Sequence, residues 1–271
     1  MIDAIARELP ATGRLGVAYS GGVDSATLLA VARRVLGRDR VLAILAVSAS
    51  LPAAERRSAV ELAAAIDAPL VEIVTRELDR PAYAANGPDR CFHCKDELFT
   101  RIDASLVAKH GLVAIAYGEN ADDTQRPDRP GTRAASEHRV LRPLAAAGIT
   151  KAQVRRLAAS LDLPVADKPA APCLASRIPH HEPVTAEKLR QIEQAEDGVR
   201  GLGVRDVRVR HHGEIARVEL DSGSLNRLGD ADFRAAVREA ALAAGFRFVT
   251  IDLAGIQSGA FTLPLVAVRH G

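Results

Sequence analysis

The order of apolar and helical segments constrains the fold of this chain more than any other feature. Four short runs lack polar alternation: Leu15–Tyr19, Val41–Val47, Leu70–Val74 and Leu112–Tyr117. Runs of this kind are typical of strands buried on both faces. Helical patterns separate them, over Ser25–Leu36, over Pro52–Ile66 and after Cys94. Strands that alternate with helices predict parallel βαβ units, with helices on both faces of the sheet.

The pattern changes in the second half of the chain. Thr150 is expected to cap a helix that ends by Pro164, and residues 118–133 and 168–183 are expected to be irregular. A helix over 185–202, a hairpin over 206–220, a helix over 231–244 and a strand over 246–253 follow. The sequence therefore predicts an α/β fold, with a parallel-sheet domain over residues 1–180 and a smaller α+β domain over 183–271.

Composition excludes several classes of protein. The 271 residues are 48% hydrophobic and 26% charged, and contain no long apolar stretch, which favours a cytoplasmic enzyme without membrane contact. Three cysteines are too few for a disulfide scaffold. A net charge of +2, aromatics at 3% and no Trp argue against a nucleic-acid partner.

A glycine-containing turn joins the first strand to the first helix. Its six residues are Ser20, Gly21, Gly22, Val23, Asp24 and Ser25. Two glycines allow a tight turn whose N–H groups face an anion at a helix N-terminus, and the two hydroxyls suit phosphate oxygens. Asp24 could hold Mg²⁺ or orient a nucleophile, and Asp122 and Asp123 of the later polar loop could bind Mg²⁺ or simply be solvated. No Lys follows the glycines, so the turn is not a Walker A loop.

The three cysteines leave several interpretations open. Cys91 and Cys94 form a CxxC pair at the start of a helix, whereas Cys173 lies in a distant proline-rich segment. With His93 the pair could bind zinc, the three thiolates could hold an iron–sulfur cluster, or all three could be buried structural thiols. Arg177 and Lys168 near Cys173 could lower the pKa of its thiol, as a nucleophile requires.

Two arginines stand on one face of the predicted hairpin. Arg208 and Arg210 alternate with valines, so their guanidiniums share a face that suits a phosphate or carboxylate, although a solvated face gives the same pattern. Ser176 and Arg177 are candidate substrate contacts because they lie close to Cys173 in sequence. Glu196 is a weaker candidate, and the pair His211–His212 is expected in the turn.

The Ser20–Ser25 turn resembles the PP-loop of ATP pyrophosphatases, and the chain as a whole resembles the LarE-type ATP-dependent sulfur transferases. These make the thiocarboxylates of the nickel-pincer nucleotide cofactor of lactate racemase. The matching segments are Ser20–Ser25, Asp89–Phe99, Gly118–Asp123, Arg129–Gly131, Arg142–Arg155, Asp167–Pro179, Val207–Leu220 and Val249–Gly259. Glu119 and the pair Ile256–Gln257 depart from the family pattern.

This resemblance implies a mechanism. A carboxylate of pyridinium-3,5-biscarboxylic acid mononucleotide would attack the α-phosphate of ATP, and Cys173 would then displace AMP. In the single-cysteine form of the family the sulfur of that cysteine is given up, whereas in the three-cysteine form the thiols bind a [4Fe–4S] cluster. The set Cys91, Cys94 and Cys173 favours the cluster. Arg208 and Arg210 would anchor the substrate, Mg²⁺ would accompany ATP at Asp24 and Asp123, and the protein would be a homo-oligomer, with a hexamer as one candidate.

Two other functions fit parts of the pattern. Some tRNA-thiolating enzymes also join a PP-loop to a CxxC pair and a third cysteine, but they need a basic surface that the net charge does not supply. A non-enzymatic nucleotide-sensing or cluster-carrying module is the other alternative. The intact Ser20, Asp24 and Ser25 argue against it.

Overall fold

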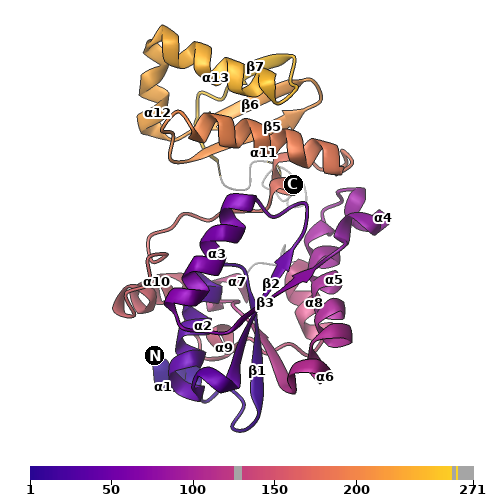
Figure 1. The fold of residues 1–271 in the computed structure, drawn as a ribbon, viewed down its shortest axis with the longest axis vertical. Coiled ribbons are helices and arrows are strands. Elements are labelled where there is room, and N and C mark those ends of the chain that lie inside the picture. Colours follow the sequence, from indigo (N-terminus) through magenta and orange to yellow (C-terminus); the bar gives the residue numbers. More distant parts are fainter. Residues whose placement is uncertain (125–129, 258–260, 262–271) are drawn as a thin grey trace, which may run out of the picture. The chain divides into compact units, whose positions relative to one another are not determined.

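The computed structural model describes residues 1–124, 130–257 and 261, and its elements are labelled in Figure 1. The chain divides into two compact units, each with its own core. The first comprises Met1–Glu77 and Asp89–Ala171, and the second comprises Leu78–Pro88 and Pro172–Gly271. Residues 78–88 and 172–180, which the sequence analysis assigned to the first domain, therefore group with the second unit.

The first unit is built on a four-stranded parallel sheet. Its strands are β1 (Arg14–Tyr19), β2 (Val41–Val47), β3 (Leu70–Val74) and β4 (Leu112–Tyr117), in the order β3-β2-β1-β4. The chain adds β2 and β3 on one side of β1 and then β4 on its other side. The strand order therefore reverses between β1 and β4. The predicted parallel α/β architecture is confirmed, and all four strands lie where their apolar runs predicted them.

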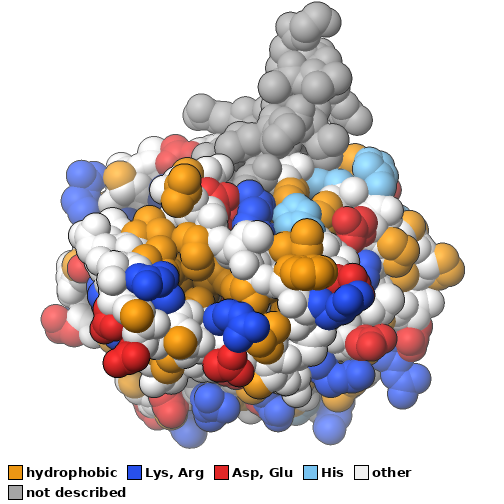
Figure 2. Space-filling model, turned by 90° about the horizontal axis from the view of Figure 1, so that it is seen from above, with side chains coloured by type: hydrophobic (Ala, Val, Ile, Leu, Met, Phe, Trp, Pro, Cys, Tyr) orange, Lys and Arg blue, Asp and Glu red, His pale blue; other side chains and the backbone are white. Residues whose placement is uncertain are grey.

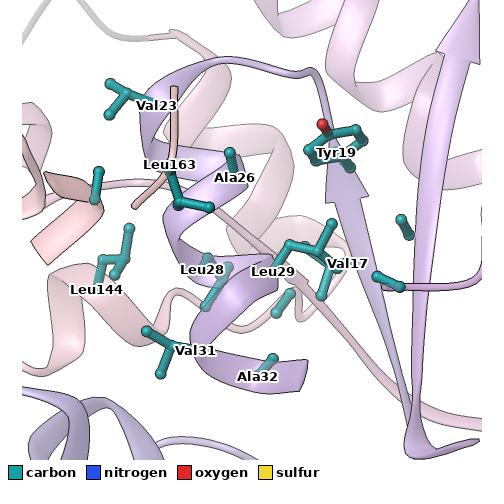
Figure 3. Close-up of a cluster of buried hydrophobic side chains, with 14 of the residues drawn as sticks. Val17, Tyr19, Val23, Ala26, Leu28, Leu29, Val31, Ala32, Leu144 and Leu163 are labelled. Atoms are coloured by element: carbon teal, nitrogen blue, oxygen red, sulfur yellow. The ribbon is translucent and has the colours of Figure 1, made fainter. Parts of the chain in front are cut away.

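Helices cover both faces of this sheet. On one face Val17 of β1 packs in a core with Leu28 and Leu29, and Figure 3 shows Leu29 of α2 next to Val17. On the other face Ile44 packs with Phe99 of α5. The helical elements of this unit are α1 (Ile2–Ala6), α2 (Val23–Leu36), η1 (Arg38–Arg40), α3 (Ala53–Ala65), α5 (Arg90–Ser105), α6 (Val107–His110), α7 (Ala121–Thr124), α8 (Pro130–Glu137), α9 (Pro143–Ala146) and α10 (Lys151–Ser160).

The segment 118–133 is not the single irregular loop that the sequence analysis expected. Residues 121–124 form α7, and α8 begins at Pro130. The side-chain oxygen of Asn120 accepts hydrogen bonds from the N–H groups of Asp122 and Asp123, at 3.0 and 3.2 Å, and so closes the first turn of α7. The predicted cap at Thr150 is confirmed, because its side chain and that of Gln153 form a capping box at the start of α10.

The second unit contains a three-stranded sheet covered by two helices on one face. β5 (Val207–His212) pairs with β6 (Ile215–Leu220) antiparallel, and β6 pairs with β7 (Phe248–Ile251) parallel. Val209, Val218 and Phe233 belong to the core beneath α11 and α13. The helical elements are α4 (Pro81–Ala84), η3 (Leu174–Arg177), α11 (Ala186–Arg200), α12 (Ser222–Asn226), η4 (Arg227–Gly229) and α13 (Ala231–Ala243), and η2 (Glu77–Asp79) lies where the units meet in sequence.

The opposite face of this second sheet carries the alternate, mostly polar residues. Arg208, Arg210 and His212 of β5 stand across from Glu219, Arg217 and Ile215 of β6, in that order. We call Arg208, Arg210, His212, Arg217 and Glu219 the arginine face. His211 and His212 belong to β5 and not to the turn, because Gly213 with φ of +62° makes the turn after them.

Charges of both signs are interspersed on the surface that Figure 2 displays, in keeping with the small net charge of the chain. No helix within the described ranges is long and apolar enough to cross a membrane.

Candidate functional site

The turn at Ser20–Ser25 lies between the end of β1 and the start of α2, as predicted. Gly21 adopts φ of +72°, and a Cβ added there would stand 2.7 Å from the Cβ of Ala59, so both conformation and space require glycine. Gly22 is the N-cap of α2 and offers no side chain to the first N–H groups of the helix. Those groups therefore face outward as donors, which is the arrangement that binds phosphates at helix N-termini.

The two serines close the turn on itself. The Ser25 hydroxyl oxygen accepts from the Ser20 N–H at 3.1 Å and lies 3.2 Å from the Ser20 hydroxyl oxygen. The end of β4 lies against the same turn, since a Cβ added at Gly118 would be 2.7 Å from the Ser25 nitrogen. Ligands of open α/β sheets bind at the carboxyl ends of the strands where the winding reverses, which here is between β1 and β4.

Two carboxylates meet at one amide beside this turn. The Asn120 amide nitrogen donates to Asp24 at 3.3 Å and to Asp123 at 2.8 Å, and Asn120 is only 2% exposed. Lys151, the first residue of α10, donates from Nζ to Asp24 at 2.5 Å. The structure thus brings the expected pair Asp24 and Asp123 together, while the magnesium that the sequence analysis assigned to them stays a prediction. Asn120 and Lys151 were missed by the sequence reasoning.

The CxxC pair lies on the first turn of α5. Cys91 is exposed and Cys94 partly exposed, and neither forms a disulfide. Cations surround this turn, because the Lys95 ammonium is 3.9 Å from the centre of the Tyr117 ring and the Arg133 guanidinium is 3.8 Å from that of Phe92. The His93 Nε2 atom lies 3.0 Å from a carboxylate oxygen of Asp89. In the part of the chain that the structure describes, no three His, Cys, Asp or Glu side chains gather as a metal site, so cluster binding stays a prediction.

Cys173 precedes η3 in the second unit, where it forms no disulfide and is partly exposed. The Arg177 Nη1 atom donates to the backbone carbonyls of Pro172 and Cys173, at 2.7 and 3.3 Å, and to the Ser176 hydroxyl at 3.0 Å. Arg177 therefore holds the backbone of the turn that carries the thiol. Lys168, which was expected to act on the same thiol, pairs with Glu55 at 2.7 Å.

The carboxylate of Glu196, which the sequence pattern placed on a solvated helix face, is fully buried and accepts hydrogen bonds from several elements of this unit. Glu196 accepts from Arg177 Nε at 2.8 Å and Nη2 at 3.1 Å, from the Val209 N–H at 3.0 Å and from Arg200 at 2.8 Å. Its exposed fraction is 0%. One glutamate on a charged helix has no sequence signal for burial, because its partner Arg177 lies on another element 19 residues away.

The shared face of Arg208 and Arg210 is confirmed, but both side chains are buried and not solvated. Arg210 donates from Nε and Nη2 to the buried Glu219, at 2.9 and 2.8 Å, and from Nη1 to the Ser176 carbonyl at 3.0 Å. Burial lowers the pKa of Arg208, and the neighbouring guanidiniums of Arg177 and Arg210 lower it further. Positive charge is therefore concentrated around Arg208, where an anion would relieve it.

The two departures from the family pattern have structural partners. Glu119 is 3% exposed and accepts from the Thr132 hydroxyl and, at 3.4 Å, from Arg142. The Gln257 carbonyl accepts from Arg208 and Arg210, each at 2.8 Å. Arg129, Ser258 and Gly259, which complete two of the matching segments, lie outside the described residues.

Comparison with known proteins finds close relatives over nearly the whole length, while no protein-family profile matches. A protein of unassigned function from Synechocystis is 40% identical over 243 residues, covering 90% of each chain. The pyridinium-3,5-bisthiocarboxylic acid mononucleotide synthase of Lactiplantibacillus plantarum is 35% identical over 247 residues, which are 91% of this chain and 88% of the synthase. A Methanocaldococcus jannaschii protein of unassigned function is 26% identical over 205 residues, which are 76% of this chain and 77% of that protein.

Proposed function

The chain belongs to the LarE family of pyridinium-3,5-bisthiocarboxylic acid mononucleotide synthases, and we propose that it is an ATP-dependent sulfur transferase acting on the nickel-pincer nucleotide precursor. Its substrate is pyridinium-3,5-biscarboxylic acid mononucleotide, and its product carries a thiocarboxylate in place of a carboxylate. The protein works as a homo-oligomer, which light scattering of the purified chain tests directly.

The first step activates the acid. A substrate carboxylate oxygen attacks the α-phosphorus of ATP, the bond to the bridging oxygen breaks, and pyrophosphate leaves with that electron pair to give an acyl adenylate. The outward N–H groups of α2 after Gly22 and the ammonium of Lys151 would stabilise the negative charge that develops on the phosphates. Asp24 and Asp123, held by Asn120, would bind Mg²⁺, which would neutralise phosphate charge.

The second step transfers sulfur. The Cys173 thiolate attacks the acyl carbon and AMP leaves, which gives a thioester. Removal of the Cys173 α-proton then breaks its Cβ–S bond, so that sulfur stays on the substrate and dehydroalanine on the protein. In the cluster version, which we favour, Cys91, Cys94 and Cys173 would ligate a [4Fe–4S] cluster that supplies a sulfide. None of the three cysteines forms a disulfide and each is at least partly exposed, so each could supply the thiolate that binds metals.

One observation carries the proposal beyond the family relationship. The Arg210 guanidinium donates to the carbonyl of Ser176, at 3.0 Å, and so ties the turn that bears Cys173 to the arginine face. The sulfur nucleophile and a set of anion-binding side chains thus lie in one unit. Arg208 anchors an anionic group of the substrate, Arg210 and Arg177 position the turn, and Ser176 contacts the substrate.

Pyrophosphate release from ATP tests the activation step. It should require the dicarboxylate mononucleotide, and it should persist in Cys173→Ala while thiocarboxylate formation is lost, because adenylation precedes the attack by sulfur. Pyrophosphate release at the same rate without the dicarboxylate mononucleotide would contradict the proposed function. So would the lack of pyrophosphate release by fully folded protein.

Cysteine variants and mass spectrometry separate the two sulfur sources. The protein is purified anaerobically, reconstituted with iron and sulfide, and analysed after a single turnover. In the cluster version Cys91→Ala and Cys94→Ala lose thiocarboxylate formation and Cys173 keeps its mass. In the sacrificial version both variants stay active, and residue 173 loses the mass of H₂S.

A further inference from the structure

Two buried nitrogen atoms on the arginine face have no hydrogen-bond partner among the described residues. They are Nε2 of His212, at the end of β5, and Nε of Arg217, in the middle of β6. The Arg217 Nη1 atom donates to Asp252 at 2.7 Å, whereas Nη2 has Glu219 only at 3.7 Å. Buried polar atoms are nearly always satisfied in folded proteins, so two unpaired nitrogens on one face indicate a missing partner. The Arg217 Nε can only donate, and the His212 Nε2 donates in the tautomer that carries the proton there.

These donors form one cluster. Arg217 pairs directly with Arg210 across the strands, and His212 lies diagonally opposite Arg217 on the same face. One aromatic ring adjoins all three: the centre of the Phe261 ring is 5.6 Å from the His212 ring centre and 5.6 and 5.4 Å from the guanidinium carbons of Arg217 and Arg210. Burial lowers the pKa of His212, and the nearby charge of Arg217 lowers it further.

Arg217 pairs with Asp252 through Nη1 and Arg210 pairs with Glu219, and the Arg217 Nε, which can only donate, favours an anion as its further acceptor. Like charges directly opposite on neighbouring strands are unfavourable, and Arg210 and Arg217 occupy such a pair. Glu219 is engaged by both Nε and Nη2 of Arg210, so it leaves the Arg217 Nε unpaired. An oxyanion between His212 and Arg217 would satisfy both donors and offset the repulsion between the guanidiniums.

We propose that His212 and Arg217 form a subsite for the phosphate monoester of the mononucleotide substrate. This assignment rests on the proposed function for the identity of the substrate. A phosphate offers three equivalent oxygens to donors that come from two different strands, whereas a carboxylate offers two oxygens in one plane. His212 lies four residues from Arg208 along β5, about 13 Å at the rise of a strand. A mononucleotide carries its phosphate and its ring carboxylates at opposite ends of the ribose, so it can reach both positions.

Inorganic phosphate tests the subsite without catalysis. The His212 ring resonances are followed by NMR in the full-length protein during a phosphate titration. We expect them to shift in a saturable way, and to shift at least tenfold less in Arg217→Gln at the same phosphate concentration. Arg238→Gln, an exposed change on α13 where Arg238 pairs with Glu239, should behave like the unchanged protein. An unmoved His212 ring in the unchanged protein would overturn the subsite.

Matched ligands identify the group that binds. Dissociation constants are measured for the dicarboxylate mononucleotide and for the same compound without its phosphate. Arg217→Gln and His212→Gln should each weaken the mononucleotide about 10- to 100-fold and the dephosphorylated compound less than threefold, because only one ligand makes the lost charged hydrogen bonds. Equal losses for both ligands would mean that the two residues only support the fold.

Arg217→Lys is the control for loss of binding through misfolding, because it keeps the charge next to Asp252. This variant should retain part of the preference for the phosphorylated ligand. If it showed no such preference although folded, the assignment would be wrong. Failure of the proposed function gives a different pattern, in which neither compound supports pyrophosphate release while the His212 ring still responds to inorganic phosphate.

Discussion

At the scale of single residues, two buried glutamates determine where the guanidiniums of the second unit lie. Glu196 joins Arg177 and Arg200, and Glu219 holds Arg210 in a two-bond pair. Both carboxylates are fully buried, so each depends on its cations for its stability in the interior. The turn that bears Cys173 is consequently held in place by an ion pair whose acidic member never meets solvent.

Replacing one of these carboxylates should destabilise the fold. In Glu196→Gln the Arg177 charge stays buried without its counterion, so we expect the free energy of unfolding to fall by about 3 kcal/mol. Urea unfolding followed by circular dichroism measures the change. Glu187→Gln, an exposed change on the same helix, should stay within about 0.5 kcal/mol. Equal effects of the two changes would contradict the structural role of Glu196.

Sequence patterns located the candidate ligand-binding residues better than the residues that support them. The turn Ser20–Ser25 lies where a strand meets a helix, as its glycines and serines predicted, and Arg208 shares a face with Arg210. The burial of Glu196 could not be predicted, and neither could the hydrogen bond from Asn120 to Asp24. Each depends on a partner distant in sequence. Asn120 acts on Asp24, 96 residues away. Spacing within a motif carries no information about such partners.

At the scale of elements, the ends of β1 and β4 and the start of α10 converge on one turn. Gly118 follows β4 and lies against the backbone of Asp24 and Ser25. Lys151 begins α10, and the capping box at Thr150 fixes that beginning. The position of the Lys151 ammonium at Asp24 is therefore set by the boundary of a helix as well as by charge.

A side chain at Gly118 should separate β4 from the turn. In Gly118→Ala the new Cβ would stand 2.7 Å from the Ser25 nitrogen, so the backbone must move. We expect the free energy of unfolding to fall by about 1–3 kcal/mol, as in overpacked cores, and pyrophosphate release to fall with it. Gly229→Ala, where a Cβ meets nothing within 4 Å, is the matched control and should change neither quantity. Normal release by folded Gly118→Ala would refute the proposed close contact.

Removal of the Lys151 charge should affect chemistry more than stability. The Lys151–Asp24 pair is partly solvated, with side chains 37% and 21% exposed, so Lys151→Gln should change the free energy of unfolding by less than about 1 kcal/mol. Pyrophosphate release should fall by about 10²-fold, because a charge that faces the phosphates is lost. Stopped assays with the dicarboxylate mononucleotide measure this rate. Lys188→Gln, whose partner is Glu182 in the second unit, should release pyrophosphate normally.

At the scale of the whole molecule, the two units use their sheets differently. The parallel sheet of the first unit is covered on both faces, and its strands are accordingly apolar throughout. The sheet of the second unit buries one face under α11 and α13 and places its charged residues on the other. The strands, the parallel first sheet and the hairpin were predictable from apolar runs and alternation, whereas the order β3-β2-β1-β4 and the pairing of β7 with β6 were not predicted. The grouping of residues 78–88 with the second unit was not, because that segment carries no compositional signal.

The stability of the folded chain should decline above about pH 10. Burial raises the pKa of Tyr19, whose hydroxyl donates to the Ala59 carbonyl, and burial followed by the charge of Glu119 raises the pKa of Tyr117. A phenol whose pKa is higher in the folded state contributes stability below its unfolded value, near 10, and loses it as the pH rises further. Tyrosinate absorbance during an alkaline titration should therefore appear together with unfolding for these two residues. Ionisation of both in the folded protein would contradict their burial.

The stability of the folded chain should also decline at acid pH. Burial lowers the pKa of His211 and of His212, so both imidazoles are held neutral in the folded state. Groups of this kind contribute stability above their unfolded pKa, near 6.5, and lose it as the pH falls. We expect the midpoint of urea unfolding to decrease between about pH 6.5 and 5, and to decrease less in His211→Asn. An unchanged slope in that variant would exclude a contribution from His211.

The turn around Cys173 is tethered by its peptide groups. Arg177 binds the carbonyls of Pro172 and Cys173, and Arg210 binds that of Ser176, so the hydrogen bonds from these two arginines use backbone atoms of the turn. These hydrogen bonds do not depend on which side chain stands at position 173. A change of sulfur chemistry at this position during evolution would therefore keep these backbone hydrogen bonds. A different nucleophile could be introduced there by mutation on the same backbone turn.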